Sequence, residues 1–116
     1  MTYLFILNDA PYAAERAYNA LRLATTLTAD ADATVKLFFV GEGVRCAAAN
    51  HQVPEGWHDI EWMLKRFLAG SREAGVCGTC LDARAITDEM LIEGTFRSSM
   101  AALSAWTAEA DKVLVF

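Results

Sequence analysis

The sequence contains only two prolines among its 116 residues, and it has no basic run, no low-complexity tract and no internal repeat. Its 10 Lys and Arg are outnumbered by 15 Asp and Glu, which gives a net charge of −5 and argues against charge-driven binding to nucleic acid or anionic lipid. No apolar stretch approaches the roughly 20 residues of a membrane span. The length and the 54% hydrophobic content predict one globular domain over residues 1–116.

Cysteine is also scarce. With three cysteines in the chain, at least one thiol stays outside any intramolecular disulfide. The first nine residues have no positively charged segment, and their apolar run ends in an Asn8-Asp9 turn, which is typical of a strand and not of a signal peptide. We therefore expect free thiols in a reducing cytoplasm.

Four runs that are continuously apolar, or nearly so, predict buried strands, the pattern of a parallel sheet that is covered on both faces. They are residues 3–7, 35–40, 74–77 and 112–116. Helical periodicity predicts helices over residues 13–28 and 57–72, a third helix beginning at Ser98 or Ser99, and a shorter helix from Thr87 through Leu91.

The predicted helix over residues 57–72 has one apolar face that would pack on the core and one tryptophan on the opposite, polar face. Its buried face comprises Trp57, Ile60, Leu64, Phe67 and Leu68. Trp62 falls between Lys65 and Arg66 on the opposite side, where an indole is a typical interface anchor. Together with the high apolar fraction, Trp62 predicts a homo-oligomer.

Alternating strands and helices predict a three-layer α/β/α sandwich of the flavodoxin or Rossmann kind, with a mainly parallel sheet of four to five strands. Functional sites of such folds lie beyond the carboxyl ends of the strands. That edge would gather residues 8–12, 41–46 and 77–84.

The strongest chemical signal is the segment from Val76 to Arg84, which contains Cys77-Gly78-Thr79-Cys80. Cys77 ends a predicted strand, Gly78 permits a sharp turn, and a helix can begin near Cys80. Backbone N–H groups at a helix start favour a thiolate, and Arg84 is a candidate stabiliser of that charge, whereas Asp82 opposes it. The C-x-x-C spacing alone fits a redox dithiol, half a metal site, a nucleophile with a spare thiol, or two packed cysteines.

Metal and nucleotide sites are less well supported. Cys46, His51 and His58 are the other candidate ligands, but they lie in one loop region and include no second close pair, so we expect no metal site. The two histidines fit polar loop residues better than a base for Cys77. Residues 41–44 form a Gly-rich turn without the third glycine of a dinucleotide fingerprint or the Lys-Ser/Thr of a P-loop, and we expect no bound cofactor.

Five segments, in order along the chain, resemble the DsrE/DsrF-like sulfur-relay family. They are Asn8-Asp9-Ala10-Pro11-Tyr12, Ala20-Leu21-Arg22-Leu23-Ala24, Val40-Gly41-Glu42-Gly43-Val44, Cys77-Gly78-Thr79-Cys80-Leu81-Asp82-Ala83-Arg84 and Ala110-Asp111-Lys112-Val113-Leu114-Val115-Phe116. The resemblance covers essentially the whole chain. One departure is Ala85, where many family members have glycine after the arginine.

The resemblance implies a DsrE-like fold and a cytoplasmic sulfur carrier that holds sulfane sulfur as a persulfide on Cys77. It implies donor and acceptor protein partners, a trimer or hexamer, and a pathway of either tRNA thiolation or sulfur oxidation. Only some of the family share Cys80, and its position three residues after Cys77 makes it a candidate auxiliary or resolving thiol. Two alternatives stay open: a thiol–disulfide redox protein using Cys77 and Cys80, and a small-ligand or nucleotide-binding module with incidental cysteines. Among the thiols we expect Cys77 to be most reactive and Cys46 least, although Arg45 beside Cys46 would lower its pKa.

Overall fold

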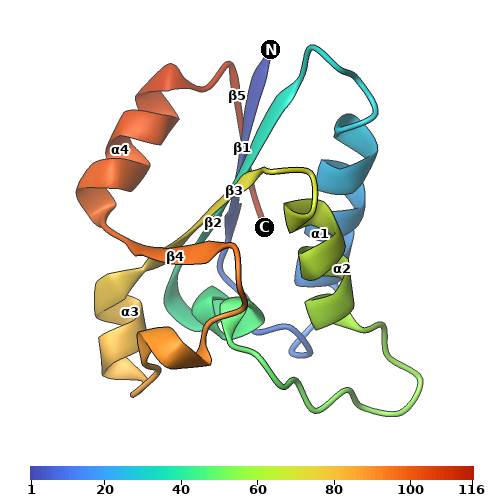
Figure 1. Cartoon of the computed structure of the whole chain (residues 1–116), viewed down its shortest axis with the longest axis vertical. Coiled ribbons are helices and arrows are strands. Elements are labelled where there is room, and N and C mark those ends of the chain that lie inside the picture. The colour runs from blue at the N-terminus through green and yellow to red at the C-terminus, as the bar shows by residue number, and fades with distance from the viewer.

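Five parallel strands form one sheet in the order β4-β3-β2-β1-β5 in the computed structural model, which describes all 116 residues (Figure 1). The strands are β1 Thr2–Leu7, β2 Thr34–Phe39, β3 Glu73–Cys77, β4 Thr95–Ser98 and β5 Lys112–Val115. The prediction of a mainly parallel sheet with four to five strands is therefore confirmed.

Helices cover both faces of this sheet, so the predicted three-layer α/β/α sandwich is confirmed. Helices α1 (Arg16–Leu27) and α2 (Ile60–Leu68) lie side by side on one face, and α4 (Met100–Glu109) lies on the other (Figure 1). Short helices follow the strands at the carboxyl edge: the 3₁₀ helix η1 (Gly41–Ala47) after β2, and α3 (Gly78–Ala83) after β3. The 3₁₀ turn η2 (Asp88–Met90) precedes β4.

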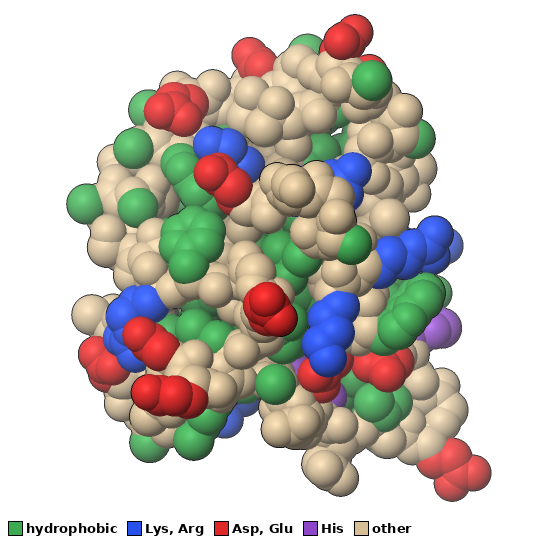
Figure 2. All heavy atoms as spheres, in the orientation of Figure 1, with side chains coloured by type: hydrophobic (Ala, Val, Ile, Leu, Met, Phe, Trp, Pro, Cys, Tyr) green, Lys and Arg blue, Asp and Glu red, His purple; other side chains and the backbone are tan.

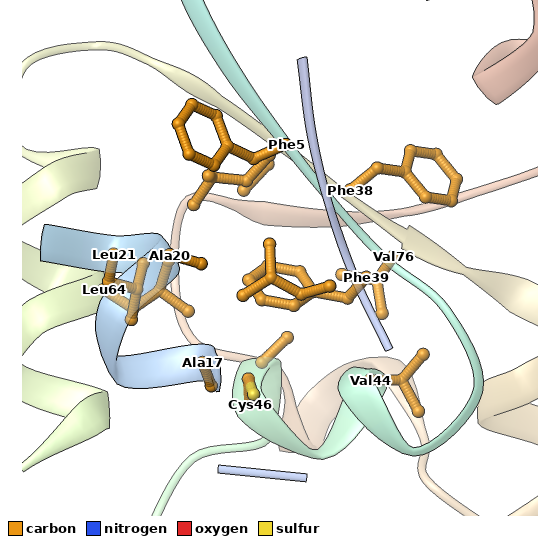
Figure 3. Packing of buried hydrophobic residues seen from close by; sticks show 14 of the residues in the cluster. Phe5, Ala17, Ala20, Leu21, Phe38, Phe39, Val44, Cys46, Leu64 and Val76 are labelled. Atoms are coloured by element: carbon orange, nitrogen blue, oxygen red, sulfur yellow. The ribbon is translucent and has the colours of Figure 1, made fainter. Parts of the chain in front are cut away.

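The core forms where α1 and α2 pack on the sheet. Helix α1 contributes small side chains, with Ala17, Ala20 and Ala24 almost fully buried, and this allows the helix to approach the sheet closely. Phe39 of β2 and Leu64 of α2 fill the space between the two layers (Figure 3). Burial of these apolar groups is the main stabilising term of the fold.

Two predicted helices are shorter than their periodic patterns, and one buried residue was predicted wrongly. Helix α1 begins at Arg16, not at residue 13. Helix α2 begins at Ile60 because the Asp59 side chain caps it, accepting a hydrogen bond of 3.0 Å from the Trp62 N–H. Trp57 therefore lies before the helix, and it is 41% exposed.

The end of the chain follows the sequence prediction closely. Ser99 is the N-cap of α4, where its hydroxyl accepts from the Ala102 N–H at 3.2 Å. Leu103 faces the core, and the Trp106 ring packs edge-on against Phe38 at 6.0 Å. The shorter helix predicted from Thr87 is a single 3₁₀ turn that ends at Met90.

Candidate functional site

The three segments predicted to meet at the carboxyl edge of the sheet do lie together there. They follow the neighbouring strands β1, β2 and β3. The Gly41 N–H donates to the sulfur of Cys80 at 3.2 Å, and the Cys46 thiol donates to the Asp9 carbonyl at 3.4 Å. Hydrogen bonds between segments far apart in the sequence thus close this edge around the cysteines.

Cys77 is the last residue of β3 and also the N-cap of α3, which begins at Gly78 and not near Cys80. Its sulfur accepts a hydrogen bond from the Cys80 N–H at 3.4 Å and lies 3.3 Å from the Thr79 hydroxyl. The residue is only 4% exposed. The strand-to-helix junction therefore aims the thiol at the N–H groups that open the helix, as the sequence predicted.

The surroundings of Cys77 favour its thiolate. Burial raises the pKa of Cys77, but hydrogen bonds from the Cys80 thiol, the Thr79 hydroxyl and backbone N–H groups outweigh burial, so the net shift is below the ordinary thiol value. A thiolate is the nucleophilic form of cysteine, which makes Cys77 the best-prepared nucleophile of the site.

Cys80 contacts Cys77 through its N–H, but its own surroundings shift its pKa in the opposite direction. Burial raises its pKa, and the hydrogen bond that its thiol gives to Cys77 raises it further, while the Gly41 N–H works in the opposite direction. The two thiols therefore differ in acidity: the pKa of Cys77 is lowered and that of Cys80 is raised, so Cys77 loses its proton more readily.

Arg84 contacts Cys80, and no hydrogen bond joins it to Cys77. Its guanidinium donates to the Cys80 carbonyl at 3.0 Å and forms an ion pair with Glu42 of η1. The charge of Arg84 favours the Cys80 thiolate, and it holds the pKa of Glu42 below its usual range. Arg84 thus ties α3 to η1, and it is not among the groups that shift the pKa of Cys77.

Arg97 of β4 is a site residue that the sequence analysis did not identify. Its guanidinium donates to the Gly78 carbonyl and to Asp82, each at 3.0 Å, and to Asp88 at 2.7 Å. It therefore fixes the turn after Cys77 and neutralises Asp82. The alternation of Phe96 and Arg97 is a weak strand signal, and no sequence pattern placed this strand beside β3.

A cleft of about 300 Å³ opens beside Cys77, between the start of α3 and the end of β4. Its lining includes Cys77, Thr79, Arg97, Ser98 and Met100. Met100 is 63% exposed at its edge. The cleft gives the nearly buried sulfur of Cys77 a route to solvent and room for an added atom.

Cys46 is a core residue. It is fully buried on η1 among the core side chains (Figure 3). Burial raises the pKa of Cys46 to about 12, so the lowering expected from Arg45 does not occur. Arg45 instead pairs with Glu42 at 3.0 Å.

The two histidines lie apart from the cysteine pair. His51 Nδ1 is 3.5 Å from the Tyr12 hydroxyl, and the His58 ring stacks on Tyr18 with 3.7 Å between ring centroids. Neither is among the groups that shift the pKa of Cys77 or Cys80. No group of three or more His, Cys, Asp and Glu side chains is placed to hold a metal ion, and no helix has the length and apolar character needed to cross a bilayer.

These environments predict the order in which the thiols react. At neutral pH iodoacetamide should modify Cys77 first, Cys80 more slowly, and Cys46 only after unfolding, because the thiolate is the reacting form. The rate at Cys77 should reach half of its maximum at a lower pH than the rate at Cys80, since their pKa values shift in opposite directions. Mass spectrometry of timed samples measures both. Labelling of native Cys46 as fast as Cys77 would contradict the structure.

A doubly wound α/β fold with a thiol of lowered pKa at the carboxyl end of the interior strand β3 is an arrangement suited to thiol chemistry. The chain belongs to the DsrE/DsrF-like family, whose model matches residues 1–116. This is a sulfur-relay family, and the resemblance drawn from the five sequence segments is confirmed.

Individual relatives support the same assignment. The chain is 33% identical over 114 residues to protein YchN of Escherichia coli, covering 97% of each, and 35% identical over 116 residues to MJ0989 of Methanocaldococcus jannaschii, covering all of both. The crystal structure of the E. coli ychN protein matches the whole of both chains with a TM-score of 0.88. MTH1491 of Methanobacterium thermoautotrophicum, at 13% identity and a TM-score of 0.80 over 99% of this chain and 98% of its own, shares the fold.

Proposed function

We propose that this protein is a sulfur carrier that accepts sulfane sulfur as a persulfide on Cys77 and passes it to an acceptor protein. The observation that carries the proposal is the position of Cys77, where a strand end and a helix start direct several hydrogen-bond donors at one sulfur. Membership of a sulfur-relay family agrees with that chemistry.

The transfer is a thiol exchange and needs no metal, base or cofactor. The Cys77 thiolate attacks the outer sulfur of a donor persulfide, the bond between the two donor sulfurs breaks, and the donor leaves as a thiolate. The product is a Cys77 persulfide, with the new sulfur in the cleft beside Thr79 and Arg97. Attack by an acceptor thiolate on that outer sulfur repeats the exchange and restores the Cys77 thiolate.

The carrier works in a reducing cytoplasm with protein partners. Free Cys77 is needed for each cycle, and a reducing compartment keeps it free. Because Cys77 is only 4% exposed, it favours a donor that presents its persulfide on a projecting loop able to enter the cleft. The surface surplus of acidic residues suits protein partners better than direct contact with RNA.

A second function has one specific observation in its favour. The Cys80 N–H donates to the Cys77 sulfur at 3.4 Å, and each cysteine side chain shifts the pKa of the other, a proximity that also suits a dithiol redox couple. Trapping the thiols after exposure to a sulfur donor separates the two. A persulfide that forms on Cys77 before any disulfide supports carriage, whereas a 77–80 disulfide that forms equally with a sulfur-free oxidant, with no persulfide intermediate, supports the redox function. Unaltered thiols would contradict both.

The carrier assembles as a homo-oligomer, a trimer or a hexamer. In support of this, Trp62 is 57% exposed on α2, and Val115 is 65% exposed on the edge strand β5. Figure 2 shows that apolar side chains reach the surface over several elements. Apolar area of this kind is commonly covered by a second subunit.

Light scattering at micromolar concentration should therefore give the mass of a trimer or hexamer. Trp62→Lys should weaken the assembly if the indole anchors it, and Gln52→Lys, which adds the same single charge in the exposed loop before α2, is the matched control. A monomer at this concentration would contradict the assembly.

A further inference from the structure

Cys80 occupies the position from which a side chain can reach the sulfur of Cys77. Cys77 is the N-cap of α3 and Cys80 is its third residue. Side chains of a helix tilt towards its N-terminus, and the third residue is the one whose N–H meets the N-cap side chain. The contact is present here: the Cys80 N–H donates to the Cys77 sulfur at 3.4 Å, and the Cys80 side chain is among the groups that lower the pKa of Cys77.

The two sulfurs of a loaded Cys77 would lie in different places. The inner sulfur is the present Cys77 sulfur, in contact with Cys80. The outer sulfur has room in the cleft lined by Thr79, Arg97, Ser98 and Met100, and Cys80 is not part of that lining. Cys80 therefore faces the inner sulfur, while the outer sulfur is directed away from it.

We propose that Cys80 resolves the Cys77 persulfide, so that the protein releases sulfide without an acceptor protein. This activity rests on the proposed carrier function of Cys77. The Cys80 thiolate attacks the inner sulfur, a bond forms between the Cys77 and Cys80 sulfurs, and the bond to the outer sulfur breaks. The outer sulfur leaves with the electron pair as hydrosulfide, which takes up the proton that Cys80 gave up.

The electrons balance within the protein. The two cysteines are oxidised to a disulfide and the sulfane sulfur is reduced to sulfide, so the release step needs no external reductant. A dithiol reductant must then reduce the 77–80 disulfide before the next cycle. Sulfide release is thus the outcome when no acceptor thiolate reaches the outer sulfur first.

The environment of Cys80 suits this role after loading. In the unloaded protein the hydrogen bond to Cys77 is one cause of the raised pKa of Cys80, second to burial. A persulfide moves negative charge from the inner to the outer sulfur, so this cause weakens when cargo is present. The Gly41 N–H still donates to the Cys80 sulfur, which favours its thiolate. Loading itself therefore prepares Cys80 to attack.

The test uses the full chain loaded with inorganic polysulfide and then freed of excess reagent. Peptide mass spectrometry measures persulfide on Cys77 and the 77–80 disulfide over time, and a sulfide assay measures release. The parent protein should lose its persulfide while gaining one disulfide for each sulfide released. Cys80→Ser should keep its persulfide and release sulfide at least about tenfold more slowly per loaded chain, because the positioned nucleophile is gone. Cys46→Ala, a core change of similar size, should behave as the parent.

The outcomes separate the two proposals. If Cys80→Ser loads and then releases sulfide as fast as the parent, Cys80 is not the resolving thiol, although Cys77 remains the carrier. If the parent gains no sulfur on Cys77, the carrier function fails and the resolving step fails with it. Persulfide found on Cys80 of the parent in place of a disulfide would also overturn the resolving role, because Cys80 would then attack the outer sulfur.

Discussion

Cys77→Ser should abolish persulfide loading, whereas Cys80→Ser and Cys46→Ala should load nearly as the parent does. A serine hydroxyl cannot form the sulfur–sulfur bond, and neither remaining thiol replaces Cys77. Cys46 is fully buried with its pKa raised to about 12. Burial and the neighbouring Cys77 raise the pKa of Cys80, which disfavours its thiolate. Total mass gain after treatment with a sulfur donor measures the loss.

Each of the three variants loses one thiol, so a comparison among them separates the role of Cys77 from the general effect of removing a cysteine. Serine is smaller and more polar than cysteine, so each variant should first show the circular dichroism and unfolding midpoint of the parent. Cys80→Ser should change the release of sulfur more than its uptake. Loading of Cys77→Ser at the level of the parent, combined with failure of either other variant, would mean that the carrier cysteine has been assigned to the wrong position.

Gly43→Ala should destabilise the fold by about 3 kcal/mol or more, an unusually large cost for one methyl group. A Cβ at this position would collide with the backbone carbonyl of Leu7, at the end of β1. That carbonyl cannot move freely, because it accepts a hydrogen bond of 3.0 Å from the Val40 N–H. The collision would push η1 off the sheet and displace the Gly41 N–H that donates to Cys80.

Gly70→Ala is the matched control. The three atoms nearest to its added Cβ all belong to the guanidinium of Arg72, the far end of a flexible side chain. Urea unfolding should therefore show a loss below about 1 kcal/mol for Gly70→Ala and a much larger loss for Gly43→Ala. Equal stability of the two variants would show that η1 does not pack against Leu7 as closely as described.

The parts of the fold that could be predicted from sequence are those encoded by local pattern. Continuous apolar runs located four of the strands within one or two residues, because strands covered on both faces carry no alternation. Ser99 was recognised as an N-cap candidate by residue type and spacing. Strand β4 was missed because it is short and lies at the sheet edge, and Thr95–Ser98 contains an arginine.

In the candidate site, too, local features could be predicted from the sequence, whereas contacts between distant segments could not. The position of Cys77 followed from a cysteine at a strand end before a glycine, which is a local feature. The donation from Gly41 to Cys80 spans 39 residues, and the one from Arg97 to Gly78 spans 19. Such contacts depend on which strands become neighbours, and no single segment encodes that. The burial predicted for Trp57 was wrong for a related reason. The helical periodicity extends back to Trp57, but the Asp59 cap makes the helix begin after it.

The most direct test of the carrier role locates the added sulfur within the chain. After treatment with inorganic polysulfide and alkylation, trypsin places Cys77 and Cys80 together in peptide 73–84 and Cys46 in peptide 46–65. Fragmentation of peptide 73–84 then distinguishes its two cysteines. The carrier function predicts one extra sulfur on Cys77 before any disulfide appears. Extra sulfur on Cys46 or Cys80 with none on Cys77, or no extra sulfur on any cysteine, would contradict it.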